Sequence, residues 1–137
     1  MTDRPLVLVV DDNPVNIDLV SFVLDLGGFE VSAAADAPAA LALIAARRPA
    51  LILMDVQLPG IDGVVLTRRL KAESATRKIV IVAFTAYAMK DDQAKLLAAG
   101  FDGYLSKPID VATFAAQVRR YLPAAQTPGT HPPAGPG

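Results

Sequence analysis

Short runs of consecutive apolar residues are the feature that most limits what this chain can fold into. Three runs, at residues 6–10, 51–54 and 79–83, contain no polar residue, and two weaker runs lie at 29–33 and 104–105. An apolar run without polar alternation is typical of a strand that is buried on both faces, as in a parallel sheet covered by helices. The runs therefore predict five strands of this kind.

Segments with helical spacing separate the strands. In the first, Pro14 follows Asn13, a residue that commonly caps a helix, and Gly27 and Gly28 end the segment. Its apolar residues recur at intervals of three and four: Val15, Leu19, Phe22, Val23 and Leu26.

Four further helices are predicted. The second begins at Asp36 with Pro38 and places Leu41, Ile44 and Ala45 on one face; the third covers 63–72 and the fourth 86–99. The last starts with Asp110 as its cap and carries an apolar stripe made of Val111, Phe114, Ala115, Val118 and Leu122. Strict alternation of strands and helices predicts an α/β fold, a doubly wound open sheet with right-handed crossovers.

The length of 137 residues fits one domain, expected over residues 1–122. From residue 123 the chain is rich in proline, glycine and alanine and has no apolar cluster to bury, so residues 123–137 are expected to be a disordered tail.

Composition excludes several classes of function. There is no cysteine and only one histidine, His131, which excludes disulfides, thiolate metal sites and a histidine-based metal site within one chain. The 13 basic and 14 acidic residues give no overall attraction to nucleic acid or to an acidic membrane. No apolar run approaches the roughly 20 residues of a membrane span, and the start lacks the features of a signal peptide. We expect a cytoplasmic protein that binds no nucleic acid and does not insert into a membrane.

Polar residues that could bind a ligand or take part in a reaction follow the predicted strands. Asp11 and Asp12 follow the first strand, Asp55 the third, Thr85 the fourth and Lys107 the fifth. In an open α/β sheet, ligands bind outside the carboxyl ends of the strands. Taken alone, the pair Asp11–Asp12 could simply cap a helix.

If the first and third strands are neighbours, three carboxylates converge on one crevice. Like charges packed so closely repel one another unless a cation neutralises them, and carboxylates without histidine or cysteine favour Mg²⁺. Magnesium is commonly shared with a phosphoryl oxygen, and a carboxylate beside a cation and a fixed ammonium can attack phosphorus to give an acyl phosphate. Lys107 and the Thr85 hydroxyl would then bind the phosphoryl oxygens.

At these residues the chain resembles the receiver domain of bacterial two-component response regulators. The resemblance covers residues 6–122, and four motifs carry it in order: residues 9–13 (VVDDN), 53–60 with 62–63 (LMDVQLPG, DG), 84–86 (FTA) and 104–108 (YLSKP). The segment 85–90 is also similar to single-domain receivers and to the receivers of hybrid kinases. The resemblance implies a flavodoxin-like five-stranded parallel sheet of order 2-1-3-4-5.

The resemblance also implies a role for each matching residue. Asp55 would be the phosphoacceptor, and Asp11 and Asp12 would hold Mg²⁺ together with Asp55 and the backbone carbonyl of Gln57. Thr85 and Lys107 would bind the phosphoryl group. Tyr104 matches the aromatic residue that switches with the threonine, although an aromatic side chain at a strand edge also commonly only packs. Lys107–Pro108 matches a peptide bond that is often cis.

We therefore expect a stand-alone receiver that accepts phosphate from a histidine kinase or histidine phosphotransfer protein and catalyses only its own phosphorylation and dephosphorylation. Its downstream protein target would bind a face made of the fourth helix, fifth strand and fifth helix. One alternative is a phosphatase of the haloacid dehalogenase type, against which Gln57 stands where such enzymes usually carry a second acid. The other is a receiver that is never phosphorylated and serves as a scaffold.

Overall fold

The computed structural model describes residues 4–56, 63–85, 90–107 and 109–122. Strands and helices alternate strictly along this part of the chain, as the apolar runs predict. The strands are β1 (Leu6–Val10), β2 (Glu30–Ala34), β3 (Leu51–Asp55), β4 (Val80–Thr85) and β5 (Gly103–Ser106). The helices are α1 (Pro14–Leu26), α2 (Ala37–Ala46), α3 (Gly63–Ala72), α4 (Lys90–Ala98) and α5 (Phe114–Tyr121).

All five strands form one parallel sheet in the order β2-β1-β3-β4-β5. This confirms the predicted doubly wound fold and its strand order. The reversal of strand order lies between β1 and β3, where Val9 pairs with Leu53 and Val10 with Met54. Ligands of open α/β sheets bind outside the strand ends at such a reversal.

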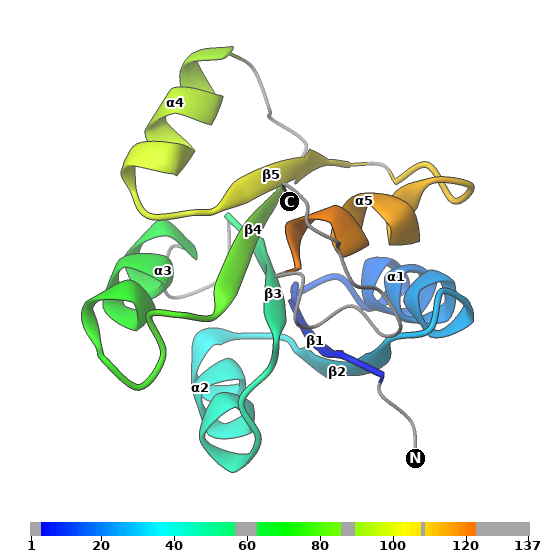
Figure 1. Ribbon diagram of the computed structural model, residues 1–137, viewed down its shortest axis with the longest axis horizontal. Coiled ribbons are helices and arrows are strands. Elements are labelled where there is room, and N and C mark those ends of the chain that lie inside the picture. Colours follow the sequence, from blue (N-terminus) through cyan, green and yellow to red (C-terminus); the bar gives the residue numbers. More distant parts are fainter. Residues whose placement is uncertain (1–3, 57–62, 86–89, 108, 123–137) are drawn as a thin grey trace, which may run out of the picture.

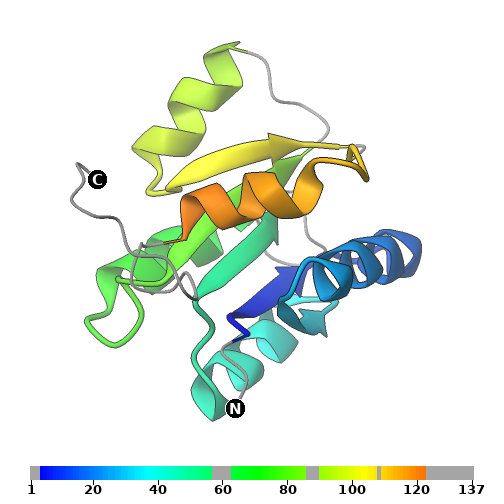
Figure 2. The ribbon, with the colours of Figure 1, turned by 45° about the vertical axis from the view of Figure 1, so that its right-hand side comes forward.

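Helices cover both faces of the sheet, so each face has its own core. Figures 1 and 2 show α1 and α5 on one face and α2, α3 and α4 on the other. Side chains alternate between the faces along each strand: on β1, Val7 and Val9 face α1 and α5, whereas Leu8 and Val10 face the other three helices. The continuous apolar runs are therefore explained by burial on both sides. Within the described residues, no helix is long and apolar enough to cross a bilayer.

Helix α1 forms as its spacing predicts, but most of the apolar residues that recur along it at intervals of three and four face solvent. Asn13 caps the helix: its side-chain oxygen accepts hydrogen bonds from the N–H groups of Val15 and Asn16. The buried residues of α1 are Val20, Val23 and Leu24. The exposed ones include Val15, Leu19, Phe22 and Leu26. The helix is apolar on two faces, and helical spacing alone does not say which of them the core takes.

The start of α5 differs from the prediction. The helix begins at Phe114, not after Asp110, because residues before it form a turn in which the Asp110 carbonyl accepts the N–H groups of Thr113 and Phe114. The Asp110 side chain accepts the N–H of Ala112 instead of capping α5. Val111 is consequently 57% exposed and does not share the buried stripe of Phe114 and Val118. Residues 86–89 of the predicted fourth helix and the predicted tail at 123–137 lie outside the described residues.

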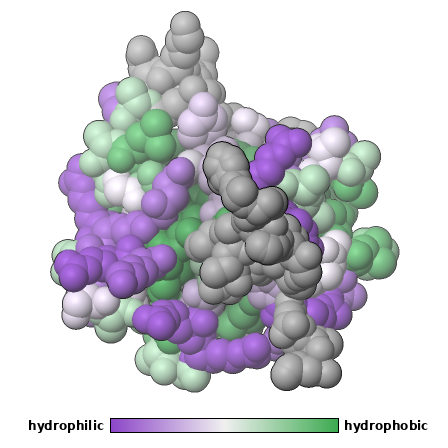
Figure 3. Space-filling view, viewed as in Figure 1, coloured by the Kyte–Doolittle hydropathy of each residue, from purple (hydrophilic) through white to green (hydrophobic). Residues whose placement is uncertain are grey.

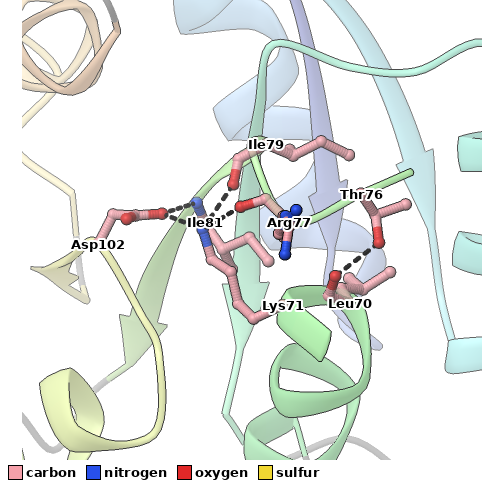
Figure 4. Close-up of polar contacts among 7 residues, drawn as sticks. All are labelled: Leu70, Lys71, Thr76, Arg77, Ile79, Ile81 and Asp102. Carbon is pink, nitrogen blue, oxygen red and sulfur yellow. Dashed lines mark hydrogen bonds and ion pairs between the residues drawn. The ribbon is translucent and has the colours of Figure 1, made fainter. Parts of the chain in front are cut away.

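A cluster of polar contacts joins α3 to the segments at the amino-terminal ends of β4 and β5 (Figure 4). The acids follow the strands at the opposite, carboxyl-terminal ends. Lys71 of α3 donates to the carbonyls of Arg77 and Ile79 and forms an ion pair with Asp102 at 2.8 Å. The same Asp102 oxygen accepts the N–H of Ile81 on β4. The Asp102 carboxylate thus joins the segment before β5 to both α3 and β4. These contacts at the amino-terminal ends of the strands use no residue from the carboxyl-terminal ends.

Candidate functional site

The alternation that builds the core on the α1 and α5 face also positions the charged side chains at the strand ends. Val9, Leu53 and Leu105 belong to this core, on three different strands. Because side chains recur on one face at every second residue, Asp11, Asp55 and Lys107 continue the same face two residues further along. Asp11 and Asp55 are buried, with 0% and 8% of their surface exposed.

Asp11 is fixed by its backbone and by the first turn of α1. Its N–H donates to the carbonyl of Ala34 on β2, and its Oδ1 accepts the N–H of Asn13. Its Oδ2 accepts no hydrogen bond of good geometry from the described residues, although the Lys107 ammonium lies 3.0 Å away. A buried carboxylate oxygen that keeps a free lone pair is suited to binding a cation.

Lys107 lies between the two buried acids. Its Nζ is 3.0 Å from Asp11 Oδ2 and 3.3 Å from Asp55 Oδ2, and its side chain is 18% exposed. The backbone N–H of Lys107 donates to the carbonyl of Thr85 at 2.9 Å, which joins the segment after β5 to the end of β4. The ammonium therefore partly neutralises a site that would otherwise gather only negative charge.

Asp12 completes an acidic cluster. Carboxylate oxygens of Asp11, Asp12 and Asp55 lie within 4.8 Å of one another, and Asp12 is exposed whereas the other two are buried. Three carboxylates this close together match the oxygen-rich ligand set that Mg²⁺ prefers. The predicted convergence of these acids is confirmed by the geometry.

Thr85 and Tyr104 lie on the neighbouring strands β4 and β5. Thr85 is the last residue of β4 and is buried, and Tyr104 of β5 is half-buried and packs against the core on the α2–α4 side. Ala83 pairs with Tyr104, so Thr85 lies on the same face two residues further along β4. Gln57, predicted to supply a carbonyl ligand, and Pro108 of the predicted cis bond lie outside the described residues.

Two residues that matter to this geometry received no role in the sequence interpretation. A Cβ at Gly63, the first residue of α3, would lie 2.3 Å from the Asp55 carbonyl oxygen, so the close approach of α3 to the end of β3 requires glycine. Phe84 lies beneath the Lys107 ammonium, which is 5.1 Å from the ring centroid. Both residues lie within the motifs that carry the family resemblance, at 62–63 and 84–86, but neither motif indicates these contacts.

Comparisons with known proteins agree with this geometry. The family model of the response regulator receiver domain matches residues 7–119. The polar-differentiation response regulator DivK of Brucella anthropi is 38% identical over 116 residues, which cover 85% of this chain and 94% of that protein. The chain therefore belongs to the response regulator receiver family, the signalling modules of two-component systems.

Solved structures give the same class. The chemotaxis response regulator CheY4 of Vibrio cholerae superposes with a TM-score of 0.81 at 29% identity, over 87% of this chain and 99% of that one. The receiver domain of the sensor histidine kinase PA1611 from Pseudomonas aeruginosa has a TM-score of 0.77 at 35% identity, over 86% and 97% of the two chains. That second structure holds a magnesium ion coordinated in its active-site cleft.

The acidic cluster should make the metal-free protein less stable than its core allows. Asp12→Asn removes one of three neighbouring negative charges, so we expect the free energy of unfolding without divalent cations to rise by on the order of 1 kcal/mol. Urea unfolding in the presence of a chelator measures this. Asp18→Asn, on the exposed side of α1, is the matched control and should change little. A loss of stability in Asp12→Asn would mean that Asp12 is structurally paired.

Proposed function

We propose that this receiver accepts one phosphoryl group on Asp55 from a phosphohistidine of a protein partner. The observation that carries the proposal is the Lys107 ammonium, which lies within 3.3 Å of both buried carboxylates at the point where strand order reverses. A fixed cation beside a carboxylate neutralises the repulsion between that carboxylate and an incoming phosphoryl group.

In the proposed step, an Asp55 carboxylate oxygen forms the new bond to phosphorus. The bond from phosphorus to the imidazole nitrogen of the donor breaks, its electron pair stays on that nitrogen, and the nitrogen takes up a proton. Lys107 and the Thr85 hydroxyl bind the phosphoryl oxygens, so Lys107 exchanges its ion pairs with the acids for contacts with the phosphoryl group. Such transfer needs mainly positioning and charge neutralisation. Water would later hydrolyse the acyl phosphate at the same site.

Asp11, Asp12 and Asp55 are the described residues that would hold Mg²⁺, with the Gln57 carbonyl as a further proposed ligand. When bound, the ion would neutralise charge on the transferred phosphoryl oxygens. The closeness of the three acids, and an Asp11 Oδ2 that accepts no hydrogen bond from the described residues, support this assignment. A magnesium ion in the related PA1611 receiver supports it further.

The exposed stripe of α1 supports a protein as the phosphoryl donor. Val15, Leu19, Phe22 and Leu26 are 72%, 41%, 62% and 71% exposed, and they lie on successive turns of a helix that starts beside Asp11 and Asp12. Figure 3 shows hydrophobic groups at the right-hand edge, where α1 lies in the view of Figure 1. Because the stripe leads away from the acidic cluster, a partner that docks on it can bring a histidine to Asp55. Asp18, exposed on the same helix, adds a negative charge near the stripe, whereas Asp25 is already paired with Arg4 at 2.7 Å.

The output would use Thr85 and Tyr104. We propose that the Thr85 hydroxyl moves toward the phosphoryl oxygens and that Tyr104, on the same face of the neighbouring strand, fills the space it leaves. This would reshape the surface of α4, β5 and α5 that a downstream protein target binds. The bias requires a contact that exists only in the phosphorylated state.

Phosphorylation itself can be tested with a small donor. Incubation with acetyl phosphate and Mg²⁺ should add one phosphoryl group to the wild type, read by intact-mass spectrometry, and none to Asp55→Asn or to wild type with a chelator. Asp36→Asn, at the cap of α2, is the control and should label normally. Equal labelling of Asp55→Asn and the wild type would show that another residue accepts the phosphoryl group. Steady turnover of unrelated phosphomonoesters would favour a phosphatase.

Docking on α1 separates a protein donor from a small one. Phe22→Glu places a charge in the centre of the stripe, so phosphotransfer from the most active of the host's histidine kinases should slow by about tenfold or more. Labelling by acetyl phosphate should stay unchanged because Phe22 is not at the acidic cluster. Val65→Glu, at an exposed apolar residue of α3, is the matched control. A kinase rate that Phe22→Glu leaves unchanged would place the docking surface elsewhere.

The proposed switch has a direct spectroscopic test. On addition of beryllofluoride and Mg²⁺ to the wild type, the ring resonances of Tyr104 should shift. In Thr85→Ala they should shift much less, because the hydroxyl that couples the two sites is gone. Thr113→Ala, on the turn before α5, serves as the control. If Tyr104 responds fully in Thr85→Ala, the coupling runs through other residues.

A further inference from the structure

The Lys107 ammonium has a third neighbour besides the two acids. Its Nζ lies over the face of the Phe84 ring, 5.1 Å from the centroid. An ammonium presents three N–H donors, and the carboxylate oxygens of Asp11 and Asp55 lie 3.0 Å and 3.3 Å from it. An aromatic face carries negative charge density and attracts a cation that is partly removed from water.

Phe84 is itself held rigidly. Its ring is 2% exposed and packs against Phe114 of α5, with the ring centroids 5.7 Å apart and the planes tilted by 43°. On the sheet, Phe84 pairs with Asp55 of β3 on one side and with Leu105 of β5 on the other. It therefore lies between the strand that carries the proposed phosphoacceptor and the strand that leads to Lys107.

A lysine side chain has a flexible stem of four carbons, so two ion pairs alone leave its ammonium free to move between them. A ring fixed by the sheet and by α5 restricts that movement. We propose that Phe84 is a positioning residue that holds the Lys107 ammonium between Asp11 and Asp55, ready for the incoming phosphoryl group. This inference rests on the proposed function, in which Lys107 binds the phosphoryl oxygens.

Replacing Phe84 with leucine keeps an apolar core residue but removes the aromatic face. Phosphorylation by acetyl phosphate at saturating Mg²⁺ should slow by about fivefold, the size expected for a partly buried cation–π contact. Phe29→Leu is the matched control: Phe29 is fully buried in the same core and has its own cation over the ring, Arg119 at 4.6 Å. Phe29 lies just before the start of β2, whereas the acids follow the strands at their carboxyl ends. Phe29→Leu should lose comparable stability and keep the wild-type rate.

A graded substitution keeps the test informative if Phe84→Leu fails to fold. Phenylalanine at position 84 is replaced by analogues with one, two and three ring fluorines, which weaken the negative face while nearly keeping the shape. The phosphorylation rate should fall stepwise along the series at an almost constant melting temperature. A second readout needs no phosphorylation: the ε-methylene protons of Lys107 should be shifted upfield by the ring in the wild type and lose that shift in Phe84→Leu.

These measurements separate a failure of the proposed function from a failure of the proposed role of Phe84. If the wild type is not labelled on Asp55, the proposed function fails. If the wild type is labelled but the fluorinated series shows a constant rate, or Phe29→Leu slows the reaction as much as Phe84→Leu does, the positioning role of Phe84 is overturned. An ε-methylene shift that persists in Phe84→Leu would overturn it as well.

Discussion

The ion pairs of Lys107 with Asp11 and Asp55 are the interaction on which the site depends. Two carboxylates with 0% and 8% exposure at the edge of one sheet repel each other, and neither is surrounded by enough water to screen that repulsion. A single ammonium, 3.0 Å from Asp11 Oδ2 and 3.3 Å from Asp55 Oδ2, offsets it. The folded protein therefore keeps a compact anionic site. Among the described residues, the Lys107 ammonium lies where a phosphoryl group on Asp55 would need a positive charge.

The rest of the fold places that group. Because the strands are parallel, the carboxyl-terminal ends of β1, β3, β4 and β5 lie side by side. The alternation of core residues directs Asp11, Asp55 and Lys107 to the same face of the sheet. Lys71 and Asp102 tie the opposite, amino-terminal ends, so the helix-to-strand junctions there are held without using any residue of the site. The exposed stripe of α1 starts at the acidic edge, which links the chemistry to a surface that a protein partner can cover.

Much of this could be predicted from the sequence because the apolar runs define buried strands and the polar residues directly follow them. The strand order came from the family resemblance, since apolar periodicity does not determine which strands are neighbours. Three features needed the structure. Helical spacing did not reveal that Phe22 and its neighbours on α1 face solvent, the Asp110 turn delays α5 until Phe114, and the contact of Phe84 with Lys107 joins residues from different strands. Each of them depends on tertiary packing, which a local pattern does not encode.

In the proposed mechanism, Lys107 exchanges its contact with Asp11 for the phosphoryl group on Asp55. A crystal structure of the protein with Mg²⁺ and beryllofluoride, which mimics a phosphoryl group, tests it most directly. We expect beryllium bonded to an Asp55 oxygen, the metal ion at Asp11 and Asp12, and Lys107 Nζ within hydrogen-bond distance of a fluoride. An adduct on Asp55 with Lys107 still paired to Asp11, or no adduct on Asp55, would contradict it.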